Sequence, residues 1–357
     1  MNILKSPKVI ACRSFIDRHR IATMLICSSV LVFLLGWLML WPILQPLPPV
    51  ETPDIVVKKP DPVYYSTLTG KKVKDEAMTT WPTAAIMIEN SPDARPQSGL
   101  KQAGVVYEAI AEGGITRFLA LYQEDKPTLI GPVRSLRPYF VDWLTPYNAS
   151  VVHVGGSSAA LKRIRNGEYR DIDQFFNAST YWRSTDRYAP HNVYTNFNRI
   201  DALNKAKKYT NSTFTGFDRV DGESAEKPTA TTITINFSSN LFNTQYKYNA
   251  KKNNYERYLA GEKHIDREKG AIAPDAVIAM KVNQKIVMED GYRESIETIG
   301  TGEAIIFQNG TATKAAWSKP SRKDSITFKN KEGKSIPLVR GQTWIAAVPN
   351  GQGSITW

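Results

Sequence analysis

Residues 149–161 read ASVVHVGGSSAAL. The run Ala149–Val154 is rich in β-branched residues, which is typical of a strand, and the serines after Gly155 and Gly156 are typical of a helix start. We expect the helix to continue through Ile164. A strand that turns through glycines into a helix is the repeating unit of α/β domains, so this stretch predicts an α/β fold.

The segments around this stretch extend the pattern over residues 81–221. Strands are expected at 84–89, 105–111 and 116–122, where apolar and β-branched residues gather. Aromatic and apolar residues recur at helical spacing after Pro138, and Ile200 begins a similar pattern in a later helix. These elements predict a first exported domain of α/β class, and an α+β arrangement also remains open.

The sequence changes character after residue 222. A loop-like stretch, 222–231, precedes a series of short runs that read almost wholly as strands. Asn309-Gly310 lies between two alternating runs, which is a strong signal for a tight hairpin. Residues 222–357 therefore predict a second domain that is mainly antiparallel β, either one sheet or a small sandwich.

The N-terminal part predicts a membrane anchor. Ile21–Trp41 is a run of 21 residues without a charge, and about 20 apolar residues cross a bilayer as a helix. Residues 1–20 hold five basic residues and one acid, so this segment is expected in the cytoplasm and the later domains outside. A cleaved signal peptide is the alternative, but no small-residue cleavage site follows the run.

The stretch that follows the apolar run is predicted to be a linker, residues 42–80. Pro42–Pro62 holds 7 of the 21 prolines in the chain. Such a composition favours an extended, semi-rigid spacer. The expected order is thus a cytoplasmic segment (1–20), a transmembrane signal anchor (21–41), the linker and two domains.

The net charge of +12 invites a nucleic-acid interpretation. Its distribution argues against it: residues 1–20 contribute +4 (five minus one), residues 81–221 +3 (17 minus 14) and residues 222–357 +5 (19 minus 14). A third of the excess positive charge thus lies in residues 1–20, where it indicates membrane orientation and not a binding surface. An exported location also argues against nucleic-acid binding. The two cysteines, Cys12 and Cys27, exclude a disulfide scaffold.

Arginine is concentrated in the first domain, with 11 Arg and 6 Lys in residues 81–221. Arg95, Arg117, Arg134 and Arg137 stand in short segments punctuated by Gly and Pro. Arginine recognises carboxylate and phosphate groups with a planar pair of donors, so these four predict a site for an anionic ligand. Ion pairing with nearby acids is the equally weighted alternative.

The glycine turn after His153 is a second candidate for ligand binding. Free N–H groups at a helix start favour an anion, and ligands of open α/β sheets gather beyond the carboxyl ends of strands. His153, Gly155, Gly156 and Ser157 are therefore candidate ligand-binding residues. The alternative, which we weight more heavily, is that the serine only caps the helix.

The candidate catalytic residues are Glu108, Glu112, His153 and His191. A spacing of four on a strand would place both glutamates on one face, where their pKa values can be driven apart for acid–base work. Neutralisation of nearby arginines is the favoured alternative. The histidines form only a weak metal signature, and the sequence indicates no metal site and no cofactor.

The chain also resembles a known family, through nine short segments: Leu68–Gly70, Ala94–Leu100, Val106–Glu108, Ala111–Phe118, Gly131–Arg134, His153–Gly156, Ala189–Asn192, Gly302–Ile305 and Gly341–Trp344. The family is that of YerB-like bacterial cell-envelope lipoproteins, in which two domains of unknown function follow one another. The resemblance implies an envelope-anchored bacterial protein, and it implies no reaction and no catalytic residues.

The chain departs from the family in its expected anchor. Members often carry a lipid-modified cysteine, but Ile26 before Cys27 is too bulky for that processing and no apolar run precedes Cys12. A transmembrane helix is expected to replace the lipid.

Two functions remain open at this point. The first is a membrane-anchored extracytoplasmic protein that binds an anionic envelope ligand, such as a cell-wall polymer or a peptide carboxylate, or that scaffolds envelope proteins. The second is an envelope hydrolase or transferase that uses Glu108 or Glu112 with His153 or His191.

Overall fold

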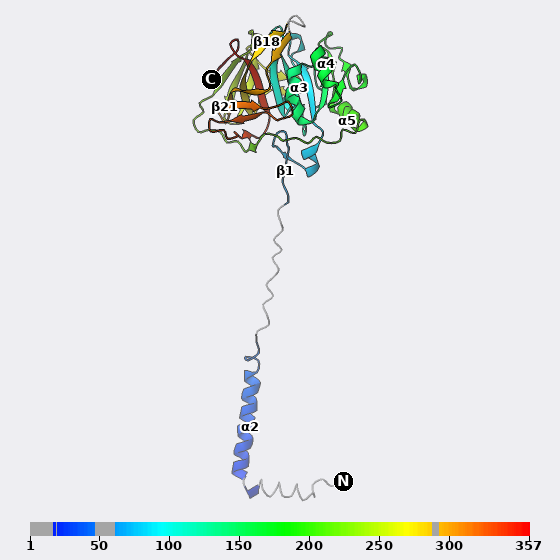
Figure 1. Ribbon diagram of the computed structural model, residues 1–357. Coiled ribbons are helices and arrows are strands. Elements are labelled where there is room, and N and C mark those ends of the chain that lie inside the picture. Colours follow the sequence, from blue (N-terminus) through cyan, green and yellow to red (C-terminus); the bar gives the residue numbers. More distant parts are fainter. Residues whose placement is uncertain (1–16, 19, 47–60, 288–292) are drawn as a thin grey trace. The chain divides into compact units, whose positions relative to one another are not determined.

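The computed structural model describes residues 17–18, 20–46, 61–287 and 293–357 (Figure 1). The chain divides into two compact units, Met1–Asp61 and Pro62–Trp357, which are described separately. Most of the basic N-terminal segment, with Cys12, and residues 47–60 of the predicted linker lie outside the described residues.

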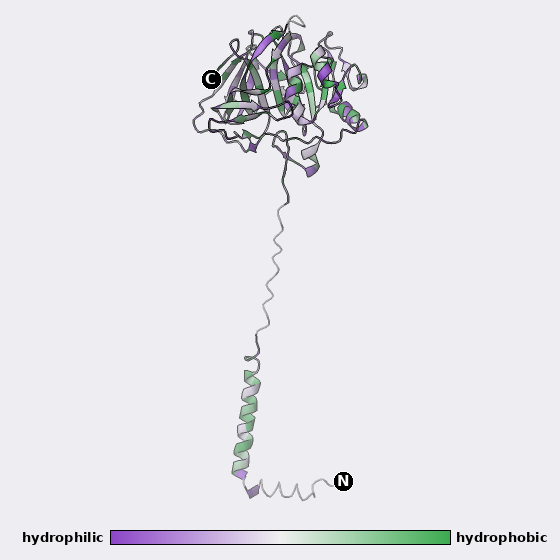
Figure 2. Ribbon diagram, in the orientation of Figure 1, coloured by the Kyte–Doolittle hydropathy of each residue, from purple (hydrophilic) through white to green (hydrophobic). Residues whose placement is uncertain are grey.

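The first unit contains one long helix, α2 (Arg20–Leu40), which confirms the predicted apolar helix to within one residue. None of its residues is buried, and Figure 2 shows apolar colouring along most of its length. Among the described residues it is the one helix long and apolar enough to cross a membrane. A helix that is apolar all round cannot be stable in water without a partner surface, so α2 is suited to a lipid environment.

The second unit is organised around a large mixed sheet. Its central path consists of β22 (Thr327–Lys329), β21 (Thr311–Lys319), β20 (Gly300–Gln308), β17 (Ala276–Val282), β24 (Thr343–Pro349), β4 (Val105–Glu112), β5 (Ile115–Tyr122), β3 (Ala84–Glu89), β6 (Ser150–His153) and β7 (Arg170–Asp173). A hairpin of β18 (Gln284–Val287) and β19 (Arg293–Ile296) joins this sheet through β4. In Figure 1, β21 and the C-terminus lie on the left, while α4 and α5 lie on the right.

Both predicted domains contribute strands to this one sheet. β24 pairs in parallel with β17 on one side and with β4 on the other, so a strand near the C-terminus joins the two parts. The sequence predicted a separate sheet for the later part, and no local pattern shows that β24 pairs with a strand more than 200 residues away. The boundary between residues 221 and 222 stays a prediction.

Three helices and a second sheet cover the large sheet. α3 (Pro138–Leu144) and α4 (Ser158–Ile164) pack on one face, and α5 (Phe197–Ala206) packs on the other. The second sheet also covers that other face, and its strands in order are β14 (Glu262–Lys263), β13 (Asn254–Leu259), β12 (Thr244–Asn249), β11 (Thr232–Asn236) and β25 (Ser354–Thr356). The result is a mixed α/β first part and a mostly antiparallel β second part.

Local sequence signals explain several of these elements. Asn309 and Gly310 both have positive φ, 56° and 77°, as the predicted tight turn between β20 and β21 requires. Pro138 opens α3, and the side chain of Ser157 accepts a hydrogen bond from the backbone N–H of Ala160 at the start of α4. The predicted strands and helices around residues 149–161 are confirmed.

Short two-stranded ribbons complete the unit: β1 (Tyr64–Tyr65) with β2 (Lys72–Val73), β8 (Trp182–Arg183) with β9 (Val193–Tyr194), β10 (Arg219–Val220) with β23 (Leu338–Val339), and β15 (Ile265–Asp266) with β16 (Gly270–Ala271). Two of them position the candidate site. The β8–β9 loop and the β15–β16 turn both approach the segment that follows β3.

Candidate functional site: an arginine-lined cleft

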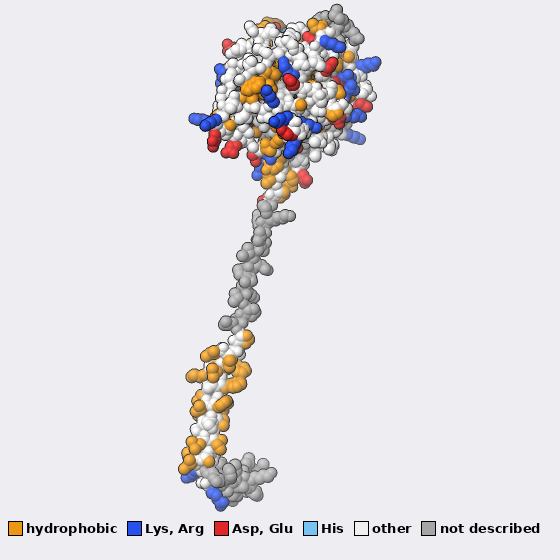
Figure 3. Space-filling view, turned by 60° about the vertical axis from the view of Figure 1, so that its left-hand side comes forward, with side chains coloured by type: hydrophobic (Ala, Val, Ile, Leu, Met, Phe, Trp, Pro, Cys, Tyr) orange, Lys and Arg blue, Asp and Glu red, His pale blue; other side chains and the backbone are white. Residues whose placement is uncertain are grey.

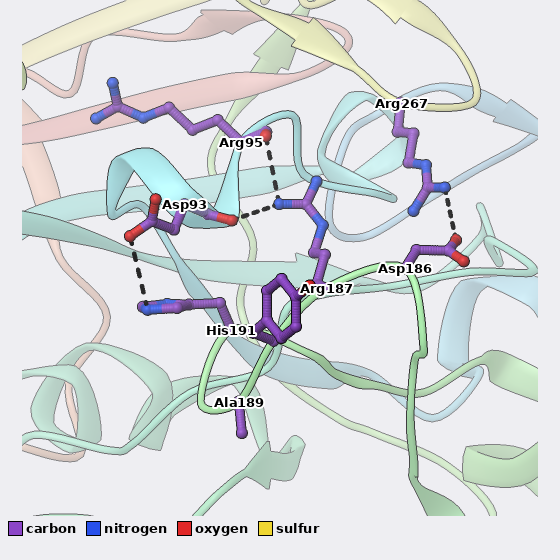
Figure 4. A pocket seen from close by; sticks show the side chains of 8 residues that line it. Asp93, Arg95, Asp186, Arg187, Ala189, His191 and Arg267 are labelled. Atoms are coloured by element: carbon purple, nitrogen blue, oxygen red, sulfur yellow. Dashed lines mark hydrogen bonds and ion pairs between the residues drawn. The ribbon is translucent and has the colours of Figure 1, made fainter.

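A cleft of about 730 Å³ lies where these three segments meet (Figure 4). It is lined by Asp93 and Arg95 after β3, by the β8–β9 loop from Asp186 to His191, and by Arg267 from the β15–β16 turn. Loops at the ends of strands are the usual place for binding residues, because the sheet holds them in position while their side chains remain accessible.

The turn that carries Arg267 is fixed by its own hydrogen bonds. The carboxylate of Asp266 accepts the backbone N–H groups of Glu268 and Lys269, at 3.1 and 3.0 Å. The backbone N–H of Arg267 donates to the carbonyl of Gln97 at 2.8 Å. The second part of the chain thus supplies one wall of a cleft whose other walls belong to the first part.

Arg187 is held by backbone carbonyls and not by a carboxylate. Its Nη1 donates to the carbonyl oxygens of Asp93 at 2.6 Å and of Arg95 at 3.3 Å, and its Nη2 donates to that of Pro96 at 2.7 Å. Within the described part of the chain, no acid forms an ion pair with Arg187. Its positive charge is therefore placed in the cleft without neutralisation.

Arg95 also has neutral partners. Its Nε donates to the side-chain oxygen of Asn90 at 3.2 Å, and its Nη2 donates to the carbonyls of Asn90 and Leu241. Burial and the charge of Arg257 lower the pKa of Arg95 to about 10, against the opposing effect of Glu108, so it stays charged at neutral pH. Figure 4 shows its side chain extending away from Arg187, so Arg95 borders the cleft rather than filling it.

The remaining polar groups of the cleft are paired. Arg267 forms an ion pair with Asp186 at 2.9 Å. His191 places its Nδ1 at 2.9 Å from Glu89 and its Nε2 at 3.9 Å from Asp93. Because Glu89 is buried and fixes one ring nitrogen, the other nitrogen of His191 is directed toward the cleft.

Of the predicted ligand-binding residues, Arg117 and Arg137 lie together but away from the lining of this cleft. Both form ion pairs with Glu112, at 2.9 and 2.8 Å. Burial alone would raise the pKa of Glu112, but the charges of the two arginines hold it below its ordinary value. Arg134 forms an ion pair with Glu89 at 3.1 Å. All three arginines are therefore paired with acids, as the alternative to ligand binding expected.

Glu108 and Glu112 do not share a face, which corrects the spacing argument. The pairing of β4 with β5 shifts between Ile110 and Glu112, so Ala111 is an extra residue that reverses the alternation. Glu108 consequently points into the core between the two sheets, where it accepts a hydrogen bond from Arg257 at 2.8 Å. Glu112 points to the opposite side.

His153 likewise lies on the face opposite to Glu108. His153 is two residues after Val151 on β6, so both point to the face covered by α3 and α4. Glu108 is two residues after Val106 on β4, so both point to the face covered by the second sheet. The ring nitrogens of His153 contact the carbonyl of Gly155 at 2.7 Å and Asp171 at 2.9 Å. Glu108 and His153 thus do not converge in one cleft, as a shared catalytic role would require.

The residues of the glycine turn, Gly155, Gly156 and Ser157, all make contacts within the protein. The N–H of Gly155 donates to Asp173 at 3.0 Å, and Ser157 caps α4. A side chain at Gly156 would approach the carbonyl of Leu136 to 3.0 Å, which explains the glycine. These contacts fit the interpretation that the serine caps the helix and the glycines turn the chain.

Arg95 and His191 are the two sequence candidates that line the cleft, and sequence reasoning missed Arg187 and Arg267. Arg187 directly precedes the aromatic loop Tyr188–Tyr194, so its position beside His191 was a usable signal. Nothing in the sequence indicated that Arg267 lines the cleft, because this residue belongs to the second predicted domain, 80 residues after Arg187. In the described part of the chain, no three His, Cys, Asp or Glu side chains are arranged to hold a metal.

Comparisons with known proteins agree with the two-part organisation. Residues 68–210 match the family "Protein of unknown function (DUF3048) N-terminal domain", and residues 233–345 match its C-terminal domain. The chain is 33% identical over 290 residues to "Putative lipoprotein YerB" of Bacillus subtilis (strain 168), which spans 79% of this chain and 86% of that protein.

A solved structure shows the same fold. The crystal structure of the YerB protein from Bacillus subtilis superposes with a TM-score of 0.73 at 31% identity, and it covers 82% of this chain and 100% of that one. The apolar helix and the description of the relative as a lipoprotein indicate a membrane-associated, extracytoplasmic protein. The chain belongs to the YerB-like family, whose members combine an N-terminal and a C-terminal DUF3048 domain.

Proposed function

We propose that this protein is anchored in the membrane by α2 and binds an anionic ligand of the cell envelope in the arginine-lined cleft. The anchor is a single crossing with the N-terminus in the cytoplasm, supported by the five basic residues against one acid in residues 1–20. The second unit then lies outside the cytoplasmic membrane, where cell-wall polymers and envelope proteins are its available partners.

The observation that carries this proposal is the unneutralised charge of Arg187. Most other arginines of the first part that are named above are paired with acids, so their charges are already balanced. A guanidinium that is held rigidly by carbonyls and faces a cleft has lost its conformational freedom before a ligand arrives. Binding an anion there forms charge-assisted hydrogen bonds at little further entropic cost.

The charge distribution on the surface of the second unit favours binding at one local site over general binding of polyanions. In Figure 3, acidic and basic side chains are interspersed over the visible face, with no continuous basic stripe on that face. A nucleic-acid binder would need such a stripe together with exposed aromatic residues.

An envelope hydrolase or transferase is the second candidate, and the Glu89–His191 pair favours it. A buried carboxylate that orients a histidine toward a cleft is the arrangement of a general acid–base pair. The test is release of soluble fragments from cell-wall material by the wild type and by His191→Gln. Equal release by both proteins, or none, rejects this candidate.

The binding proposal is tested by co-sedimentation of the full chain, in detergent, with purified cell-wall fractions at 50 and at about 300 mM salt, because ion pairing is screened by salt. We expect binding at low salt that is reduced at high salt and by an excess of soluble carboxylate. Binding that neither salt nor competitor changes would contradict an anion site.

A further inference from the structure

The three carbonyls leave Nε–H and one of the two hydrogens of Nη2 on Arg187 without a hydrogen-bond partner among the described residues. Nε–H and the adjacent Nη2 lie side by side on the same edge, which is the geometry that accepts two oxygens of one planar group. Figure 4 shows Arg187 between Asp93 on one side and the Asp186–Arg267 pair on the other.

The charge of the cleft limits the charge of its occupant. Arg267 is already paired with Asp186, and the guanidinium of Arg95 extends away from the cleft. Arg187 has no ion-pair partner among the described residues, so it supplies one unpaired positive charge, leaving His191 aside. A monoanion balances this charge, whereas a phosphate monoester carries about −1.5 to −2 at neutral pH and exceeds it. A polymer with a phosphate in each repeat would bring further negative charges against Asp93 and Asp186.

The two acids are also placed to accept hydrogen bonds from a ligand. The side chain of Asp93 is 83% exposed and that of Asp186 is 58% exposed, so both keep free acceptor capacity at the rim. A ligand that fits should carry N–H donors close to its anionic group. A peptide end has this combination, because the amide N–H of the last residue lies next to the terminal carboxylate.

Tyr188 supplies an apolar surface beside these polar groups. Its side chain belongs to the cleft lining and is 91% exposed, which is unusual for a ring of this size. An aromatic ring gives a large contact area at low entropic cost and packs against an aliphatic side chain or the flat face of a peptide bond.

We propose that the cleft binds the C-terminal carboxylate of a peptide, with the Nε–Nη2 edge of Arg187 as its anchor and Tyr188 packing against the last residues. This inference rests on the proposed function and names its ligand class.

The test compares two dye-labelled tetrapeptides of Gly and Ala, one ending in a free carboxylate and the other in an amide, by fluorescence polarisation with the full chain in detergent. We expect the acid to bind about tenfold or more tightly than the amide, because the amide lacks the charge and one acceptor. Equal affinities overturn the inference, and this comparison needs no variant.

Arg187→Lys keeps the charge and removes the planar pair of donors, so we expect it to weaken acid binding about tenfold. The matched control is Arg199→Lys, because Arg199 also donates to two backbone carbonyls, those of Ser179 and Tyr181, but lies outside the cleft lining. Unchanged binding by Arg187→Lys contradicts its role as anchor.

A poly(glycerol phosphate) probe separates this inference from the proposed function. If the polymer binds through Arg187 and the acid peptide does not, the peptide assignment is wrong while the anion site stands. If neither probe binds and cell-wall fractions are not retained, both fail.

Discussion

The guanidinium of Arg257 donates to the carboxylate of Glu108 at 2.8 Å, and both side chains are completely buried between the two sheets. The indole N–H of Trp344 donates to the same carboxylate oxygen at 2.8 Å. This ion pair joins β13, from the second family domain, to β4 in the first. The two domains therefore share a polar core beneath the cleft.

The ion pair is part of a closed ring of side-chain hydrogen bonds. In order around the ring, the members are Glu108, Thr116, Asn90, Gln97, His264 and Arg257. Gln97 and Asn90 also hold the segment that carries Arg95, so the ring forms the support of the cleft.

Removing one partner of the ion pair should be strongly destabilising. Glu108→Ala leaves the charge of Arg257 buried without compensation, and we expect a loss of about 3–5 kcal/mol in the free energy of unfolding. The matched control is Glu256→Ala, which removes an exposed ion pair with Lys263 on the neighbouring β14 and should cost less than about 1 kcal/mol. Urea unfolding of both variants measures the difference, and similar small losses would contradict the structural role of Glu108.

His264 should make stability depend on pH. Burial and the charges of Arg257 and Arg95 hold its pKa well below the ordinary value, so it stays neutral in the folded protein. The unfolded chain takes up this proton below about pH 6.5, and the unfolded state then binds more protons than the folded one. The free energy of unfolding should therefore fall as the pH drops below about 6.5, by up to about 1.4 kcal/mol per pH unit.

The measurement is urea unfolding between pH 7.5 and 5.0 for the wild type, His264→Gln and His191→Gln. We expect the slope to decrease in His264→Gln, since that titrating group is absent, and to persist in His191→Gln. An unchanged slope in His264→Gln would assign the pH dependence to other groups.

The tight turn after β20 offers a test of the fold itself. A Cβ at Gly310, where φ is +77°, would approach Tyr248 to 2.5 Å and Pro228 to 2.9 Å. Gly333 has the same φ of +77° with nothing within 4 Å, so Gly333→Ala reports the backbone cost alone, about 1 kcal/mol. We expect Gly310→Ala to destabilise the protein by about 1–3 kcal/mol more in thermal unfolding. Equal effects would mean that Gly310 is not closely packed.

The second unit should fold without its anchor. Residues 62–357 form one compact unit, and a solved relative covers 82% of this chain. We expect this fragment to remain soluble and to unfold within a few degrees of the full chain in detergent, because all its core residues are retained. A fragment that aggregates or lacks a cooperative transition would show that the anchor contributes to folding.

The elements that were predicted correctly are those that depend on local sequence patterns. The run Ala84–Glu89, the glycine turn after His153 and Asn309-Gly310 all adopt the expected structure, because their conformations depend on neighbouring residues. The parallel pairing of β24 with β4 was not predictable, since it joins residues 343–346 to residues 105–108 and leaves no periodic signal in either strand.

The candidate site was predicted in part for the same reason. Arg95 and His191 stand in segments with clear turn signals, and both border the cleft. The bulge at Ala111 could not be seen in the sequence, so the two glutamates were expected on one face. Arg267 reaches the cleft only because the second domain packs against the first.

The central claim is that Arg187 binds an anionic envelope ligand, and one ratio tests it most directly. It is the amount of Arg187→Ala retained by cell-wall fractions at 50 mM salt, divided by the amount of Arg199→Ala retained under the same conditions, with equal unfolding temperatures as the check on folding. We predict a ratio of about one tenth or less, since a charged hydrogen-bonded contact is lost in only one of the two variants. A ratio near one would contradict the claim.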